Sequence, residues 1–173
     1  MPKSSNKKIE EDKNKIILEL RNNSRQSPHE IAKKLGFSRQ KVWKIIKELE
    51  KENIIWGYTA IVDDRERSIY FAVSKLKAPI YDNIDKIIEN VKKDTESKHN
   101  IGLMGSFYIN GIYDWLIAFT AETLLDAKKF CTHVQKEHVD YIERIELMET
   151  IFPLIKFGKI NPNIEKLKEF TTV

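Results

Sequence analysis

The chain has 173 residues, enough for one large domain or two small ones. Hydrophobic residues make up 41% and charged residues 32%, with a formal net charge of +4, so a core can form beneath a heavily charged surface. No window approaches about 18 uninterrupted apolar residues, the polar N-terminus lacks an apolar signal region, and Cys131 has no disulfide partner. These features exclude a membrane span and predict a cytoplasmic protein.

Positive charge is concentrated in the first third of the chain. Residues 1–60 contain 14 Lys/Arg and 8 Asp/Glu, a net charge of +6, whereas residues 61–173 contain 16 and 18, a net charge of −2. A basic segment joined to a slightly acidic one is typical of a polyanion-binding module attached to another domain. An uneven surface with no charged partner is the alternative that charge alone leaves open.

The first third predicts three short helices. Residues 1–8 are a Lys/Ser/Asn stretch that we expect to be a disordered basic tail. The first helix is predicted from Asp12 to Asn23, because Ile16, Ile17 and Leu20 lie on one helical face.

The second and third helices are marked by their ends. Ser27, Pro28 and Glu30 form a capping-box pattern that predicts a helix beginning at Pro28. Gly36 can adopt the left-handed conformation that ends this helix. Ser38 is placed to cap the third helix, whose apolar residues recur at i, i+3, i+4 and i+7. Two helices joined by about three residues around a glycine match the helix-turn-helix pattern.

The third helix has a polar face suited to DNA. Residues 38–47 include four basic residues and no acidic one, and acids return only at Glu48. Positive charge is thereby placed on the N-terminal half, which enters the major groove in helix-turn-helix proteins. A solvated Lys/Glu face is the alternative, but the separation of charges favours DNA. The side chains on or beside this face are Arg39, Gln40, Lys41, Trp43, Lys44 and Lys47.

The rest of the chain predicts an α+β domain. Residues 54–62 predict a strand that leaves the helical domain 9–62, and residues 63–67 a charged linker. Residues 68–152 then alternate as strands and helices in the order βαββαβ, which predicts a ferredoxin-like antiparallel sheet with both helices on one face. The predicted segments are 69–74, a helix from Asp82 to Val91, 101–109, 112–120, a helix at 123–135, and 142–152. Residues 153–173 are predicted to be a tail with a short helix at 164–170.

Two features of the third predicted strand bear on assembly. Asn110-Gly111 is the signal for a tight two-residue hairpin, because both residues tolerate positive φ. The strand that follows, Ile112 to Thr120, is apolar on both of its faces. We therefore expect the sheet face without helices to meet a second sheet, most simply that of an identical subunit.

Chemical sites are few. Asp114 lies within this apolar strand, and a buried carboxylate needs donors or a cation; a ligand's ammonium group and the strand's own turn are both open explanations. Cys131 and His133 would point about 200° apart on a helix, so with His138 they do not predict a metal site. The sequence has neither a glycine-rich phosphate loop nor a nucleophile elbow. We expect no cofactor and no enzyme activity.

Several stretches in order resemble one family, the Lrp/AsnC or feast/famine transcription regulators. The resemblance runs from about Asp12 to Phe152 and rests on residues 27–38 (SPHEIAKKLGFS), 49–50 (LE), 54–60 (IIWGYTA) and 111–114 (GIYD). The first stretches look like the family's helix-turn-helix and exit strand, and the last looks like its Gly-x-Tyr-Asp hairpin.

The resemblance implies a DNA-binding domain, a linker, and a dimerising domain that binds a small effector, often an amino acid. It implies double-stranded DNA and an identical subunit as partners, in a homodimer or a higher even oligomer. The DNA-reading positions that it implies are Ser38, Arg39, Gln40, Trp43, Lys44 and Lys47. The effector-loop positions that it implies are Gly111, Tyr113 and Asp114.

Two alternatives are open. Ile45 and Glu48 stand where the family often has Arg, which leaves room for a sensor that acts on a protein partner without DNA. Siroheme decarboxylases share this two-domain plan, which makes an enzyme the second alternative. Their His-Asn motif is poorly matched, because His99-Asn100 lies too far before Trp115.

Overall fold

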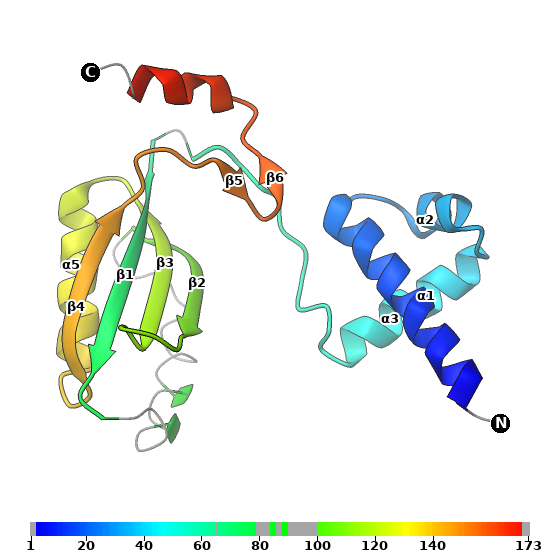
Figure 1. Ribbon diagram of the computed structural model, residues 1–173, viewed down its shortest axis with the longest axis horizontal. Helices are drawn as coiled ribbons and strands as arrows, with labels where there is room; N and C mark the ends of the chain where they lie inside the picture. The colour runs from blue at the N-terminus through cyan, green and yellow to red at the C-terminus, as the bar shows by residue number, and fades with distance from the viewer. Residues whose placement is uncertain (1–2, 65, 79–83, 86–87, 90–99, 171–173) are drawn as a thin grey trace. The chain divides into compact units, whose positions relative to one another are not determined.

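The computed structural model describes residues 3–64, 66–78, 84–85, 88–89 and 100–170. The chain divides into two compact units, which we call unit 1 (Met1–Ile61) and unit 2 (Val62–Val173). Unit 1 is helical and unit 2 is built on a β-sheet (Figure 1).

Unit 1 consists of three helices. They are α1 (Lys3–Asn22), α2 (Pro28–Leu35) and α3 (Arg39–Lys51). The disordered tail predicted for residues 1–8 is wrong from Lys3 onward, because α1 begins there. Extending a helix that is already nucleated adds one hydrogen bond for each residue fixed, so a polar stretch can continue a helix that it would not start.

The ends of α2 and α3 confirm the predicted caps. The backbone N–H of Glu30 donates to the Ser27 hydroxyl at 3.3 Å, and the Glu30 carboxylate accepts from the Ser27 N–H at 2.7 Å. Gly36 ends α2 in the left-handed conformation, with φ of 67°. The Ser38 hydroxyl accepts from the Lys41 N–H at 3.2 Å and begins α3.

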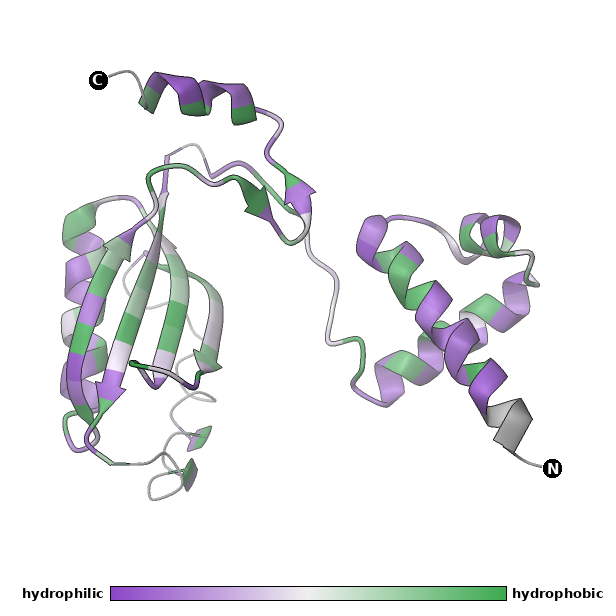
Figure 2. Cartoon of the chain, viewed as in Figure 1, coloured by the Kyte–Doolittle hydropathy of each residue, from purple (hydrophilic) through white to green (hydrophobic). Residues whose placement is uncertain are grey.

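The three helices enclose one small apolar core. Its buried side chains come from all three helices, each of which carries hydrophobic residues among its polar ones (Figure 2). They are Ile16, Ile31, Ala32, Val42, Ile45 and Leu49. Because α3 contributes three of them from one side, its opposite side is left for solvent or a partner.

The strand predicted for residues 54–62 is wrong, since this segment has no regular structure. Every side chain along it except that of Ile55 is exposed, with Ile54 at 53%, Trp56 at 94% and Tyr58 at 51%. A strand needs a neighbour for its backbone N–H and C=O groups, and no described strand pairs with this segment.

Unit 2 is built on a four-stranded antiparallel sheet. Its strands are β1 (Ser68–Leu76), β2 (Gly102–Tyr108), β3 (Trp115–Ala121) and β4 (Ile142–Glu149), in the order β2-β3-β1-β4. This is the strand order of a ferredoxin-like sheet, so the predicted fold class is confirmed. The helix predicted from Asp82 falls largely outside the described residues, of which 84–85 and 88–89 are helical.

Helix α5 (Leu124–Glu137) packs on one face of this sheet (Figure 1). Ala127, Cys131 and Val134 are its buried side chains. They join the sheet core, in which the Phe119 ring lies 5.7 Å from that of Tyr70. Residues 69, 71 and 73 of β1 alternate with the core residues and therefore face away from α5.

The tight hairpin predicted at Asn110-Gly111 is wrong. The connection between β2 and β3 covers residues 109–114 and is closed by a hydrogen bond from the Ile109 N–H to the Asp114 carbonyl at 2.9 Å. The backbone N–H of Asp114 donates to the Ser74 carbonyl at 2.9 Å, and its carboxylate binds the N–H of Leu76. These contacts tie Asp114 to β1, so the β2–β3 ladder begins only at Trp115.

The C-terminal segment contains a hairpin that sequence reasoning missed. Strands β5 (Ile155–Lys156) and β6 (Lys159–Ile160) are joined by Phe157 and Gly158, whose φ angles of 47° and 76° are those of a primed turn. The Lys156 ammonium lies 2.9 Å from the Asp64 carboxylate. A 3-10 helix, η2 (Ile164–Phe170), follows where a short helix was predicted.

Candidate DNA-binding helix and effector loop

The outer side of α3 presents six of the seven residues that the sequence predicted for DNA, all except Lys41. Trp43 is 55% exposed although it is a large apolar side chain. Val42, Ile45 and Leu49 bury the other side of the same helix. The exposed side comprises Ser38, Arg39, Gln40, Trp43, Lys44 and Lys47.

The four basic residues of the N-terminal half differ in their surroundings. The Lys41 ammonium lies 2.6 Å from a carboxylate oxygen of Asp12, and that of Lys47 lies 2.8 Å from Glu50. Arg39 and Lys44 form no ion pair with the described residues. Their charges are therefore available to an external anion without breaking an internal contact.

Helix α1 holds α3 through two neighbouring residues of opposite charge. The Lys13 ammonium lies 3.2 Å from Glu48 and 3.1 Å from Glu52, and hydrogen bonds with these carboxylates raise the pKa of Lys13. The hydrogen bond from Lys41 lowers the pKa of Asp12, against the opposing effect of its burial. Asp12 and Lys13 are therefore both charged near neutral pH.

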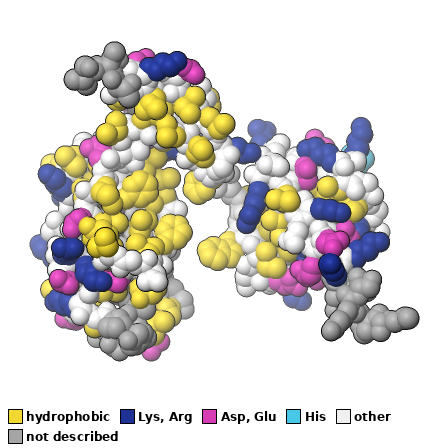
Figure 3. Space-filling model, in the orientation of Figure 1, with side chains coloured by type: hydrophobic (Ala, Val, Ile, Leu, Met, Phe, Trp, Pro, Cys, Tyr) yellow, Lys and Arg dark blue, Asp and Glu magenta, His cyan; other side chains and the backbone are white. Residues whose placement is uncertain are grey.

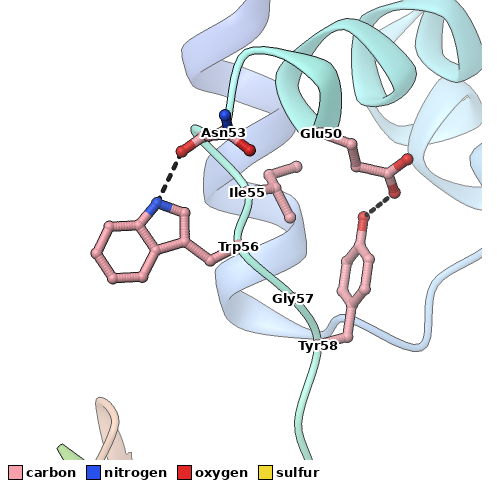
Figure 4. A pocket seen from close by; sticks show the side chains of 6 residues that line it. All are labelled: Glu50, Asn53, Ile55, Trp56, Gly57 and Tyr58. Carbon is pink, nitrogen blue, oxygen red and sulfur yellow. Dashed lines mark hydrogen bonds between the residues drawn. The ribbon is translucent and has the colours of Figure 1, made fainter. Parts of the chain in front are cut away.

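A shallow hollow of about 630 Å³ lies where α3 passes into the exit segment (Figure 4). The Tyr58 hydroxyl donates to Glu50 at 3.0 Å, and the Trp56 indole N–H donates to the Asn53 carbonyl at 2.7 Å. Figure 4 shows the two aromatic rings pointing away from each other. Hydrogen bonds from Lys47 and Tyr58 lower the pKa of Glu50. The bond from Tyr58 ties the exit segment, residues 54–62, to α3. No sequence motif marked this contact.

The carboxylate of Asp114 has partners within unit 2. It accepts a hydrogen bond from the Leu76 N–H at 2.9 Å and lies 2.9 Å from the Lys75 ammonium. The Leu76 hydrogen bond, with a smaller contribution from Lys75, lowers the pKa of Asp114. The fold itself therefore satisfies this partly buried carboxylate, through the neighbouring strand β1 and not through its own turn as the sequence suggested.

The other two predicted effector residues do not converge with Asp114. The Tyr113 hydroxyl donates to the Glu146 carboxylate of β4 at 2.6 Å. The Tyr113 side chain is thereby tied to β4 and not to Asp114. Gly111 lies in open space, where an added Cβ would meet no atom within 4 Å.

Two of the residues considered for metal or covalent chemistry, Cys131 and His138, are buried. Cys131 is buried, and burial raises the pKa of its thiol to about 11. His138 is buried against Trp115 and forms a hydrogen bond with Tyr141. The described residues contain no group of three or more His, Cys, Asp or Glu side chains placed to bind a metal ion. None of the helices in the described ranges is long and apolar enough to cross a membrane.

The sheet face opposite α5 is apolar. Figure 3 shows hydrophobic side chains gathered on unit 2. The strands place on this face Ile69, Phe71 and Val73 of β1, Phe107 of β2, Leu116 and Ala118 of β3, and Met148 of β4. Phe107 and Met148 remain 54% and 48% exposed.

Comparisons of sequence place the helices of unit 1 among known DNA-binding segments. A family described as winged helix-turn-helix DNA-binding matches residues 13–55. The HTH-type transcriptional regulator LrpA of Pyrococcus horikoshii is 42% identical over 57 residues, which are 32% of this chain and 40% of that protein. The sequence match thus spans less than half of this curated relative.

Comparisons of structure extend over both units. The crystal structure of PH0061 matches with a TM-score of 0.69 and 22% identity, over 86% of this chain and 95% of that one. An AsnC family transcriptional regulator from Agrobacterium tumefaciens matches with a TM-score of 0.64 and 16% identity, over 86% and 94%. The transcriptional regulator NMB0573 from Neisseria meningitidis, in complex with L-Met, matches with a TM-score of 0.63 and 18% identity, over 86% of this chain and 94% of that one.

The fold and the matched segment define a helix-turn-helix protein with a ferredoxin-like second domain. The resemblance to the Lrp/AsnC regulators that the sequence indicated is confirmed, by sequence in the helix-turn-helix segment and by fold over both units.

Proposed function

We propose that the chain is a sequence-specific DNA-binding transcriptional regulator of the Lrp/AsnC type, which acts in the cytoplasm and catalyses no reaction. The observation that carries this proposal is the exposed side of α3, where Arg39 and Lys44 have no ion pair with the described residues. Ser38, Gln40, Trp43 and Lys47 share that side. Phosphate contacts by such cations supply affinity, and polar side chains in the groove supply specificity.

The apolar sheet face supports a homodimer, or a higher even oligomer, as the DNA-binding form. Exposed apolar side chains such as Phe107 and Met148 lose contact with water when a second sheet covers them. A two-fold dimer presents two copies of α3 to half-sites about one helical turn apart, or a multiple of it.

The effector proposal rests on the loop 109–114 and on the L-Met complex of a structurally similar regulator. The ammonium group of an amino acid would have to displace Lys75 from Asp114, because Lys75 already occupies that carboxylate. Lys75 is partly exposed and can swing into solvent. Calorimetry with L-methionine tests this exchange; equal binding by wild type and Asp114→Asn would contradict it.

The two alternatives receive less support. The curated relative is a transcriptional regulator, which favours regulation over decarboxylation, and His99 lies outside the described residues. The sensor alternative does not account for the two exposed cations, Arg39 and Lys44, on one side of α3. Contacts with DNA phosphates do account for them.

The direct test is selection of bound duplexes from a random pool, followed by a salt titration of the recovered duplex. Each phosphate that a lysine neutralises contributes about 0.9 to the slope of log K against log salt. We expect Lys44→Met to lower this slope by about 0.9 for each copy that contacts DNA. Lys136→Met, an exposed change on α5, is the control and should leave the slope unaltered. Failure of the wild type to bind any duplex at about 50 mM salt would refute the proposal.

A further inference from the structure

One basic residue of α3, Lys41, is 40% exposed along its side chain but has its ammonium group paired within the protein. The Lys41 ammonium lies 2.6 Å from the carboxylate of Asp12, whose side chain is only 9% exposed. A carboxylate so far removed from water needs a cation or donors close by. If Lys41 turned outward to a phosphate, Asp12 would lose this partner.

The same ammonium contacts the turn of the helix-turn-helix. It lies 4.1 Å from the centre of the Phe37 ring, a distance at which a cation is attracted to the ring face. Phe37 also packs against the core of unit 1. A single side chain of α3 is thereby bound to α1 and to the α2–α3 turn.

A second contact holds the other end of α3. Lys13, the neighbour of Asp12, has a side chain that is 8% exposed and lies 3.1 Å from Glu52, the residue that caps α3. The two anchors on α3, at Lys41 and Glu52, are about 16 Å apart along the axis at about 1.5 Å per residue. Two anchors at this separation fix the direction of a helix, whereas one would allow it to pivot.

We propose that Lys41 is a positioning residue, which sets the pose of α3 through Asp12 and so its sequence specificity, and that it is not a phosphate contact. This inference rests on the proposed DNA-binding function. It assigns Lys41 a role different from that of Arg39 and Lys44, which can reach a phosphate without breaking an internal pair.

We call the Lys41–Asp12 pair the clamp. The test compares the two clamp variants, Lys41→Met and Asp12→Asn, with Lys44→Met. The probes are a duplex selected by the wild-type protein and a scrambled duplex of the same composition. We expect both clamp variants to lower the ratio of the two affinities roughly tenfold, the equivalent of one lost base contact. Their salt slope on the scrambled duplex should equal that of the wild type, whereas Lys44→Met lowers it by about 0.9 per contacting copy.

Lys41→Arg is the rescue variant, because its guanidinium can still bind the carboxylate, and its affinity ratio should be that of the wild type. A drop in slope for Lys41→Met equal to that for Lys44→Met would show a phosphate contact and overturn the inference. An unchanged ratio in both clamp variants would overturn it as well.

A measurement without DNA separates this inference from the proposed function. In thermal unfolding, the double variant Asp12→Asn/Lys41→Met should melt no lower than the worse single variant, because both changes break the same pair. Additive losses would show that the two side chains act independently, and the clamp would then be refuted whether or not the protein binds duplexes. Circular dichroism at the assay temperature verifies that each variant is folded.

Discussion

Replacing Leu49 with Ala should strongly destabilise unit 1 and leave unit 2 folded. Leu49 is 0% exposed and is one of six residues in the core of unit 1. The change removes three carbons, or about 2.4 kcal/mol at about 0.8 kcal/mol each, and the cavity left behind raises the loss to about 3 kcal/mol. A core in so small a unit rarely supplies more than about 3–5 kcal/mol, so most of the stability of unit 1 is lost.

Hydrogen exchange followed by mass spectrometry resolves the two units. Peptides from α2 and α3 should lose protection, whereas peptides from β1 and β3 should keep it, because the two cores share no residue. Leu18→Ala is the matched control: Leu18 is 57% exposed on α1, and its loss should change stability by less than about 0.5 kcal/mol. Equal loss of protection in β1 and β3 would show one cooperative unit and refute the reasoning.

Two further predictions concern titratable groups in unit 2. The Cys131 thiol, with its pKa raised to about 11 by burial, should resist alkylation at pH 8 in the folded protein and react promptly in urea; rapid reaction without urea would show that it is accessible. The pKa of Asp114 is lowered in the folded state, so its contribution to stability is present above its unfolded pKa of about 3.9 and is lost as pH falls through the folded value. Urea midpoints of wild type and Asp114→Asn should therefore differ at pH 7 and converge in acid, and a gap independent of pH would contradict this.

Local signals in the sequence predicted the ends of α2 and α3 correctly. The groups that form the capping box, Ser27 and Glu30, lie three residues apart, so the pattern contains all of its own partners. The order of strands and helices in unit 2 was equally predictable, since each element shows its own periodicity. Polar residues before Asp12 gave no such signal, because their helix is an extension of an apolar one.

The errors fall where a partner comes from a distant part of the chain. Asn110-Gly111 is a strong turn signal, yet Asp114 binds Leu76 38 residues earlier and shifts the start of β3. The exit segment 54–62 has the composition of a strand but no described strand to pair with. The β5–β6 hairpin contacts a distant segment as well, through the Lys156–Asp64 pair, whose residues are 92 apart. Periodicity carries no information about such pairs.

Helix α3 shows the same limit for charge. A helical wheel places Arg39, Lys41, Lys44 and Lys47 on or beside one face and makes them equivalent as DNA contacts. The structure separates them, since Asp12 binds Lys41 from 29 residues away while Glu50 binds Lys47 from three. The Lys47 pair is exposed and costs little to break, so Lys47 can exchange Glu50 for a phosphate. Lys41 cannot do so without leaving a nearly buried carboxylate unpaired. A count of basic residues on α3 therefore overstates the positive charge that the helix can offer to DNA under the proposed function. The charge of Lys41 is the part not on offer, because it pairs with Asp12 of α1.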